Sequence, residues 1–122
     1  MEWFEAATLL ADVLIVPAIM LIFGWTFMKK PPKDINGFYG YRTTMSMKNQ
    51  DTWAFAHQAC GRVWWRGGWA LAALSAVLLC AVQLDWLLGI LVLAAEGTAL
   101  LLTIIPVERA LKREFDKDGN RR

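Results

Sequence analysis

The chain has 122 residues, of which 57% are hydrophobic and 20% are charged, and its formal net charge is +2. This composition argues against a disordered polypeptide and against a basic nucleic-acid-binding domain, so we expect no nucleic acid among its partners. Two cysteines and one histidine argue against a disulfide miniprotein and give no Cys/His cluster. We therefore expect neither a metal nor another cofactor. Two classes of protein remain possible: a very apolar soluble fold and a membrane protein.

Three long apolar segments decide between these two classes. Residues 6–28 carry only Asp12 as a charge, and residues 67–84 carry no charge. Residues 86–107 carry only Glu96. A helix needs about 20 apolar residues to cross a hydrocarbon core of about 30 Å, and these segments are apolar on all sides rather than along one stripe. The sequence therefore predicts an all-α integral membrane protein with three transmembrane helices.

The second and third spans must form a hairpin, because a single helix over both would be about twice as long as the core is thick. The polar interruption between them runs from Gln83 to Trp86, and Asp85 suits the N-cap of the third helix.

Charge placement predicts the orientation in the membrane. All 13 Lys and Arg residues fall in two segments, residues 29–66 and residues 109–122. Basic residues collect on the cytoplasmic side of a membrane. We therefore expect the N-terminus outside, the segment 29–66 in the cytoplasm, the hairpin outside, and a basic cytoplasmic tail over residues 108–122.

The segment 29–66 holds most of the polar chemistry. In the run Asn36-Gly37-Phe38-Tyr39-Gly40-Tyr41-Arg42-Thr43, two glycines among aromatic residues predict a tight turn whose backbone packs closely. A helix is expected from about residue 46 to residue 66, with Ser46 as its N-cap. One face of that helix carries Trp53, Ala56, His57, Cys60 and Trp64. This pattern predicts a cytoplasmic amphipathic helix that lies on or against the bundle.

Small residues indicate how the spans pack. They recur every four positions along the second span, at Gly68, Ala72, Ala76 and Cys80. The third span carries Gly89 and Gly97 on one face. Such stripes let helix backbones approach closely, although alanine and glycine are also simply common in this chain. We predict that the stripes help to pack the bundle, within one chain or between protomers of a homo-oligomer.

Two acidic residues, Asp12 and Glu96, lie at membrane depth, and the spans contain no Lys, Arg or His. A buried carboxyl group is costly, so such residues usually face a bundle interior, pair, or become protonated. One interpretation is a proton-linked or ligand-linked site. The alternative is structural: Asp12 reaches outer water, and Glu96 is a neutral acid hydrogen-bonded to the backbone or to Ser75, Thr98 or Thr103.

The motif Asn36-Gly37-x-x-Gly40-x-Arg42-Thr43, followed by Ser46, Trp53 and Ala56-His57, resembles the SdpI family of bacterial membrane proteins. The tail, with Glu108-Arg109-x-Leu111 and Phe115-Asp116-x-x-Gly119-Asn120-Arg121, is similar to the short members of that family. The resemblance extends over residues 36–122, whereas the first span is similar only in being hydrophobic.

This resemblance implies a location in the bacterial inner membrane and an immunity function. The family's named member protects its producing cell against a secreted peptide toxin and holds a repressor at the membrane. The expected partners are therefore the lipid bilayer, a peptide toxin and a cytoplasmic regulator. The candidate binding residues are those of the motif: Asn36, Gly37, Gly40, Arg42, Thr43, Trp53 and His57.

Two of these residues, Arg42 and His57, have two interpretations each. Arg42 could contact an anion, a lipid headgroup or an acidic residue, or it could be a surface arginine that orients the protein. Trp53 and His57 are one helical turn apart and could form a pocket wall. The alternative for His57 is a packed or surface histidine.

Two further function classes stay open at this point. A small oligomeric transporter, linked to protons or ions, would use Asp12 and Glu96. A membrane enzyme would place His57, Arg42 and Glu96 around one cavity. Because no nucleophile–base pair or metal cluster is visible, we expect that the protein is not an enzyme.

Overall fold

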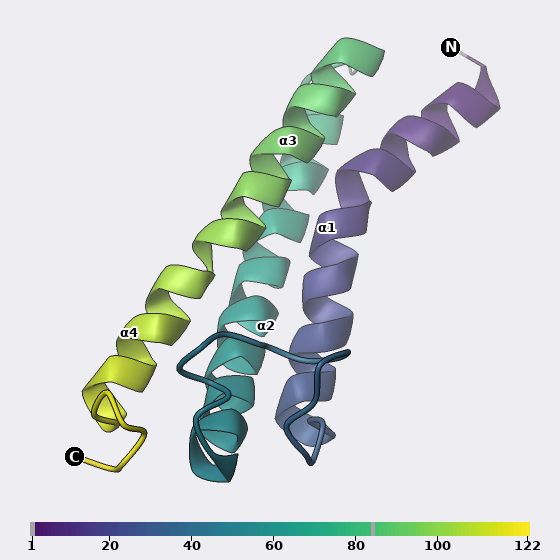
Figure 1. Cartoon of the computed structure of the whole chain (residues 1–122). Helices are drawn as coiled ribbons and strands as arrows, with labels where there is room; N and C mark the ends of the chain where they lie inside the picture. The colour runs from purple at the N-terminus through teal and green to yellow at the C-terminus, as the bar shows by residue number, and fades with distance from the viewer. Residues whose placement is uncertain (1, 84) are drawn as a thin grey trace.

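The computed structural model describes residues 2–83 and 85–122 (Figure 1). These residues form four helices: α1 (Trp3–Lys29), α2 (Gln50–Ala81), α3 (Trp86–Leu102) and α4 (Ile104–Glu114). Three helical runs are long and apolar enough to cross a membrane, namely Trp3–Lys29, Gln50–Ala81 and Trp86–Glu114. The prediction of an all-α protein with three candidate spans is confirmed. Leu84, the predicted last residue of the second span, lies outside the described residues.

Helices α1, α2 and α3 run side by side, and α4 continues from α3 toward the end of the molecule where α2 begins (Figure 1). Helix α1 packs against both α2 and α3, and α4 packs against α2. The loop between α1 and α2 folds around their adjoining ends. The start of α1 and the C-terminal end of the chain lie at opposite ends of the bundle, as an odd number of crossings requires.

Helix α2 joins two elements that the sequence predicted as separate. The expected amphipathic helix over 46–66 and the second span over 67–84 form one helix of 32 residues. At 1.5 Å per residue this helix is about 48 Å long, which exceeds a hydrocarbon core of about 30 Å. The amphipathic half therefore extends beyond the apolar half, which begins at residue 67, and does not form a separate helix in the described chain.

The predicted N-cap of this helix, Ser46, is wrong. The cap is Asn49, whose Oδ1 accepts a hydrogen bond of 2.9 Å from the Thr52 N–H. The Thr52 hydroxyl oxygen in turn accepts a bond of 3.0 Å from the Asn49 N–H. This reciprocal pair satisfies two backbone donors at once, so it fixes the start of the helix. At α3 the prediction is confirmed, since Asp85 Oδ1 accepts a bond of 2.8 Å from the Leu88 N–H.

The closest approach of α1 and α2 occurs at glycines. A Cβ atom at Gly61 would lie 2.8 Å from the carbonyl oxygen of Gly24, and a Cβ atom at Gly68 would lie 3.2 Å from the Leu21 nitrogen. The sequence pattern identified Gly68 but missed Gly24 and Gly61. These three positions let the two backbones touch.

The rest of the predicted packing stripe has a different environment. Gly89 packs near Leu9, because a Cβ atom there would lie 2.9 Å from Leu9 Cδ2. Ala76 and Cys80 are exposed, and a Cβ atom at Gly97 would have open space around it. Within this chain, the stripes therefore contribute to packing mainly at Gly68 and Gly89.

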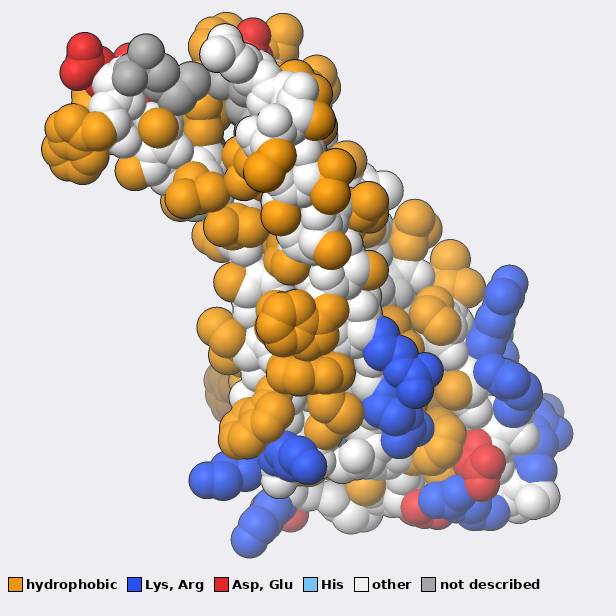
Figure 2. All heavy atoms as spheres, turned by 180° about the vertical axis from the view of Figure 1, so that it is seen from behind, with side chains coloured by type: hydrophobic (Ala, Val, Ile, Leu, Met, Phe, Trp, Pro, Cys, Tyr) orange, Lys and Arg blue, Asp and Glu red, His pale blue; other side chains and the backbone are white. Residues whose placement is uncertain are grey.

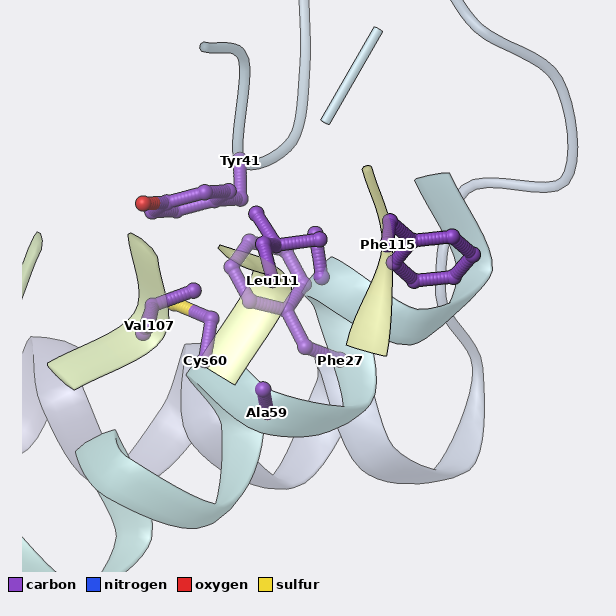
Figure 3. Packing of buried hydrophobic residues seen from close by; sticks show 8 residues of the cluster. Phe27, Tyr41, Ala59, Cys60, Val107, Leu111 and Phe115 are labelled. Carbon is purple, nitrogen blue, oxygen red and sulfur yellow. The ribbon is translucent and has the colours of Figure 1, made fainter. Parts of the chain in front are cut away.

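The main buried cluster lies at the end of the bundle that carries the loop and the tail. It draws residues from α1, the loop, α2, α4 and the tail: Phe27, Tyr41, Ala56, Ala59, Cys60, Val107, Leu111 and Phe115 (Figure 3). We call residues 27–66 and 104–122 the basal module. Every Lys and Arg of the sequence lies in it. Figure 2 shows basic side chains gathered at this end and hydrophobic side chains along the rest of the visible face.

Candidate functional site

The motif loop is shaped by its own polar groups. Asn36 Oδ1 accepts hydrogen bonds from the N–H groups of Phe38, at 2.9 Å, and Tyr39, at 2.8 Å. The exposed Arg42 donates from Nη1 to the carbonyl oxygen of Gly37. An asparagine side chain commonly closes a turn in this way. Asn36 and Arg42 therefore fix the loop from inside the motif.

Of the two motif glycines, Gly40 is the one whose backbone conformation and close neighbours require a glycine. Its φ of +121° is one that residues with a side chain rarely adopt. A Cβ atom at Gly40 would lie 2.6 Å from His57 Nε2 and 3.2 Å from Trp53 Cη2. At Gly37 a Cβ atom would have open space around it. Gly40 thus lets the loop backbone lie directly on the His57 and Trp53 rings.

His57 is fully buried and bonded at both ring nitrogens. The Tyr41 N–H donates to Nε2 at 2.8 Å, so Nε2 carries no proton, and Nδ1–H then donates to the Trp53 carbonyl oxygen at 2.8 Å. This arrangement requires the neutral imidazole. His57 lies in the amphipathic half of α2, before the apolar stretch, and burial lowers its pKa despite the opposing effect of the Trp53 carbonyl.

Trp53 joins the other end of the loop to α2. Its Nε1–H donates a hydrogen bond of 2.7 Å to the Pro32 carbonyl oxygen, and its ring lies 4.4 Å from the His57 ring, centroid to centroid. Trp53 also lines an open hollow of about 670 Å³ beside Lys29 and Lys33. His57 itself is packed beneath the loop and beside the Phe27 ring of α1, with the two ring centroids 5.0 Å apart.

Tyr41 connects the loop to α4. It is buried, and its hydroxyl donates a hydrogen bond of 2.7 Å to Glu108 Oε1. Burial, and then this bond to a carboxylate, raise the pKa of Tyr41 above its usual value. Tyr41 is not among the predicted site residues, and only the similarity of the tail to the family indicated Glu108.

The Thr43–Ser46 turn holds the loop at its exit. The Thr43 N–H donates to Ser46 Oγ at 2.8 Å, and Ser46 Oγ donates to the Tyr41 carbonyl oxygen at 2.9 Å. Ser46 is fully buried although it does not cap the helix. Thr43 is half-buried, and its Oγ1 accepts a bond of 3.2 Å from the Ser46 N–H.

The C-terminal tail docks on the start of α2. Arg121 makes a two-pronged ion pair with Asp51, with Nε–Oδ2 at 2.9 Å and Nη2–Oδ1 at 2.8 Å, and its guanidinium lies 4.7 Å from the Phe115 ring centroid. The Arg121 guanidinium lowers the pKa of Asp51. Asn49 Nδ2 donates to the Gly119 carbonyl oxygen at 2.7 Å. The motif and the tail therefore belong to one hydrogen-bonded unit.

The two acidic residues at membrane depth line different hollows. Asp12 is half-buried and lines a hollow of about 440 Å³ between the first turns of α1 and α3, together with Glu5 and Asp85. We call it the N-terminal hollow.

Within the described ranges, no group of three His, Cys, Asp or Glu residues could hold a metal ion.

Glu96 is only 4% exposed and lines a hollow of about 240 Å³ between α2 and α3. Ser75 Oγ donates to its Oε2 at a long 3.4 Å, and its Oε1 has no hydrogen-bond partner within the described chain. Thr98 bonds instead to the Ala94 carbonyl oxygen. Arg42, His57 and Glu96 contact different neighbours, so the structure does not assemble the cavity that an enzyme hypothesis required.

Three candidate spans and a basic basal module define a small multi-pass membrane protein. The model of the SdpI/YfhL protein family matches residues 33–107, a range that contains all seven motif candidates, and the chain belongs to this family. Uncharacterized protein YfhL of Bacillus subtilis (strain 168) is 33% identical over 109 residues, which is 89% of this chain and 94% of that protein. No solved structure matches the chain. The resemblance seen in the motif is confirmed, although the family model ends before the tail.

Proposed function

We propose that the protein is an SdpI-type membrane immunity and signalling protein of the bacterial inner membrane. In this proposal the N-terminus lies outside and the basal module lies in the cytoplasm, as the placement of all 13 basic residues favours. Family membership supports the general class. The proposed ligands are a secreted peptide toxin outside and a regulatory protein inside.

One observation carries the proposal: the family motif is used for structural coupling. Gly40, Tyr41 and Trp53 place the loop on α2, and Glu108 adds α4 to the same unit. None of these contacts presents a nucleophile with its base. Such an arrangement suits a protein that transmits a change in helix packing to its cytoplasmic face.

The N-terminal hollow supports recognition of a peptide from outside. It combines three carboxyl groups, of Glu5, Asp12 and Asp85, with the apolar side chains of Phe4, Leu9, Trp86 and Ile90. A cationic, amphipathic segment would match both properties. Helices α1 and α3 frame this hollow and continue to the loop and to α4, respectively. A peptide that separates them would alter the Tyr41–Glu108 contact at the far end.

The test is protection of a sensitive bacterium. Cells that express the chain should survive the secreted peptide toxin encoded beside an SdpI-type immunity protein, and cells with an empty vector should die. Membrane fractions would be probed for the protein in parallel, so that a failure of expression is visible. Death of cells with verified membrane expression, together with no cytoplasmic protein recovered on cross-linking, would overturn the proposal.

A second candidate function rests on Glu96. An acid that is 4% exposed, with one oxygen unpartnered in the described chain, suits a proton-linked transporter. Asp12 lies in a different hollow, so a pathway within one protomer would depend on Glu96 alone. A homo-oligomer would be needed to close a path through the membrane. Unchanged proton flux into liposomes after Glu96→Gln would count against this function.

A further inference from the structure

The basal module contains a further hollow, of about 590 Å³, which the proposed immunity function does not use. It opens between the Thr43–Lys48 turn, α4 and the tail. Four basic side chains line it, and they come from three separate segments: Lys48, Lys112, Lys117 and Arg122. We call it the basal hollow. Because these residues are distant in sequence, the fold itself brings their charges together.

Among the residues that the structure describes, the lysines of this hollow have no acidic partner. The ion pairs found in residues 2–83 and 85–122 join Arg121 to Asp51 and to Glu114. Lys48, Lys112 and Lys117 are all exposed and take part in neither. Their charges are therefore free to meet an anion.

Hydrogen bonds orient the Arg122 guanidinium for such a contact. Its Nε–H donates hydrogen bonds to the carbonyl oxygens of Lys112, at 2.9 Å, and Phe115, at 3.0 Å. These bonds restrain one edge of the guanidinium plane, while the two terminal nitrogens keep their donors. A fixed planar fork loses little freedom when it binds an oxyanion in two-pronged fashion.

The two acids that line the hollow, Glu108 and Asp116, accept hydrogen bonds from donors within the chain. Glu108 Oε1 accepts the Tyr41 hydroxyl, and Asp116 Oδ1 accepts the N–H groups of Asp118 and Asn120. With four basic and two acidic side chains, the hollow keeps a formal charge of +2. Phe115 and Met45 add an apolar wall.

We infer that the basal hollow binds a phosphate group. Several unpaired ammonium groups beside an oriented guanidinium are the groups that recognise phosphate oxygens in proteins. Basic pockets beside the cytoplasmic ends of transmembrane helices bind phosphate headgroups of anionic lipids. The same donors would also accept a soluble phosphate ester. The shared ligand is the phosphate, and the experiment separates its two sources.

Binding is measured on the full-length protein in detergent micelles. Native mass spectrometry counts retained phosphatidylglycerol, with phosphatidylcholine as the uncharged reference, and calorimetry measures binding of glycerol 3-phosphate. The test variant carries Lys48→Gln, Lys112→Gln and Lys117→Gln. The matched control carries Arg62→Gln, Arg109→Gln and Arg113→Gln, which removes the same charge from exposed positions outside the hollow. Circular dichroism checks that both variants keep their helices.

We expect the test variant to lose at least about tenfold in affinity, whereas the control keeps most of it. Loss of phosphatidylglycerol alone identifies a lipid source, and loss of glycerol 3-phosphate binding alone identifies a soluble source. Equal losses in the two variants would mean that the whole basic face attracts anions without a site. That result, or an absence of binding by the unmodified protein, overturns the inference.

Discussion

The Tyr41 backbone N–H donates a hydrogen bond of 2.8 Å to Nε2 of His57, and this bond fixes the charge state of the only histidine in the chain. A protonated Nε2 would place a second hydrogen against the Tyr41 N–H. The loop therefore sits on α2 only while His57 is neutral. Gly40, the residue before Tyr41, allows this bond because it has no Cβ atom, which would lie 2.6 Å from His57 Nε2.

The first prediction concerns pH. Burial lowers the pKa of His57 below the ordinary value of 6.5, so the unfolded module binds a proton more readily than the folded one. Stability is then full above about pH 6.5 and falls as the pH drops below it toward the lower, folded-state pKa. The protection factors of residues 38–46, which correct for the slower intrinsic exchange of amides at low pH, should fall at pH 5.5 relative to pH 7.5. In His57→Gln, which keeps an acceptor but cannot titrate, that difference should shrink.

The second prediction compares the two motif glycines. Gly40→Ala combines an unfavourable φ with a contact of 2.6 Å to His57 Nε2, so it should destabilise the protein by about 1–3 kcal/mol. Gly37→Ala meets open space and should change the stability by less than about 0.5 kcal/mol. Thermal unfolding of both variants in detergent measures the difference. Equal melting temperatures would show that the loop does not rest on His57.

The third prediction concerns the link from the loop to α4. Tyr41→Phe removes the donor to Glu108 and leaves the carboxylate without it, which should cost about 1–2 kcal/mol. The matched control is Tyr39→Phe on the exposed face of the same loop. Hydrogen exchange along α4 should increase in the first variant alone. If exchange in α4 is unchanged while the loop loosens, Tyr41 does not couple the two elements.

The fourth prediction concerns the contact between α1 and α2. At Gly61 an added methyl group would lie 2.8 Å from the Gly24 carbonyl oxygen, so Gly61→Ala should destabilise the bundle by about 1–3 kcal/mol. At Gly97 the same substitution has open space and gains helix propensity. Gly97→Ala should therefore be neutral or slightly stabilising. A similar loss at both positions would argue against the close α1–α2 crossing.

Local patterns predicted much of the fold. Hydrophobic run length identified the three spans, and the position of Asp85 after a polar break identified the cap of α3. The helical spacing of Trp53 and His57 placed both on the face that the structure buries. These features depend on residues that are close in sequence, so they can be read without the tertiary fold.

The contacts that sequence reasoning missed join distant segments. Tyr41 and Glu108 are 67 residues apart, and Asp51 and Arg121 are 70 apart. Their pairing follows from how α4 returns along α2, which no local spacing records. Gly24 and Gly61 were missed for the same reason, since each looks ordinary until the two helices cross. Ser46 has a residue type that suits a helix cap, but Asn49 and Thr52 form the better reciprocal pair.

The proposed immunity function is tested most directly by toxin dose–response curves of cells that express matched variants. The double variant Asp12→Asn and Asp85→Asn removes two charges from the N-terminal hollow, and Asp34→Asn with Asp118→Asn removes two charges from exposed positions of the basal module. With equal amounts of each protein in the membrane, we expect the first pair of substitutions to lower the toxin concentration that the cells survive by at least several-fold. The second pair should leave that concentration nearly unchanged. Full protection by the hollow variant would contradict recognition of the toxin at this end of the molecule.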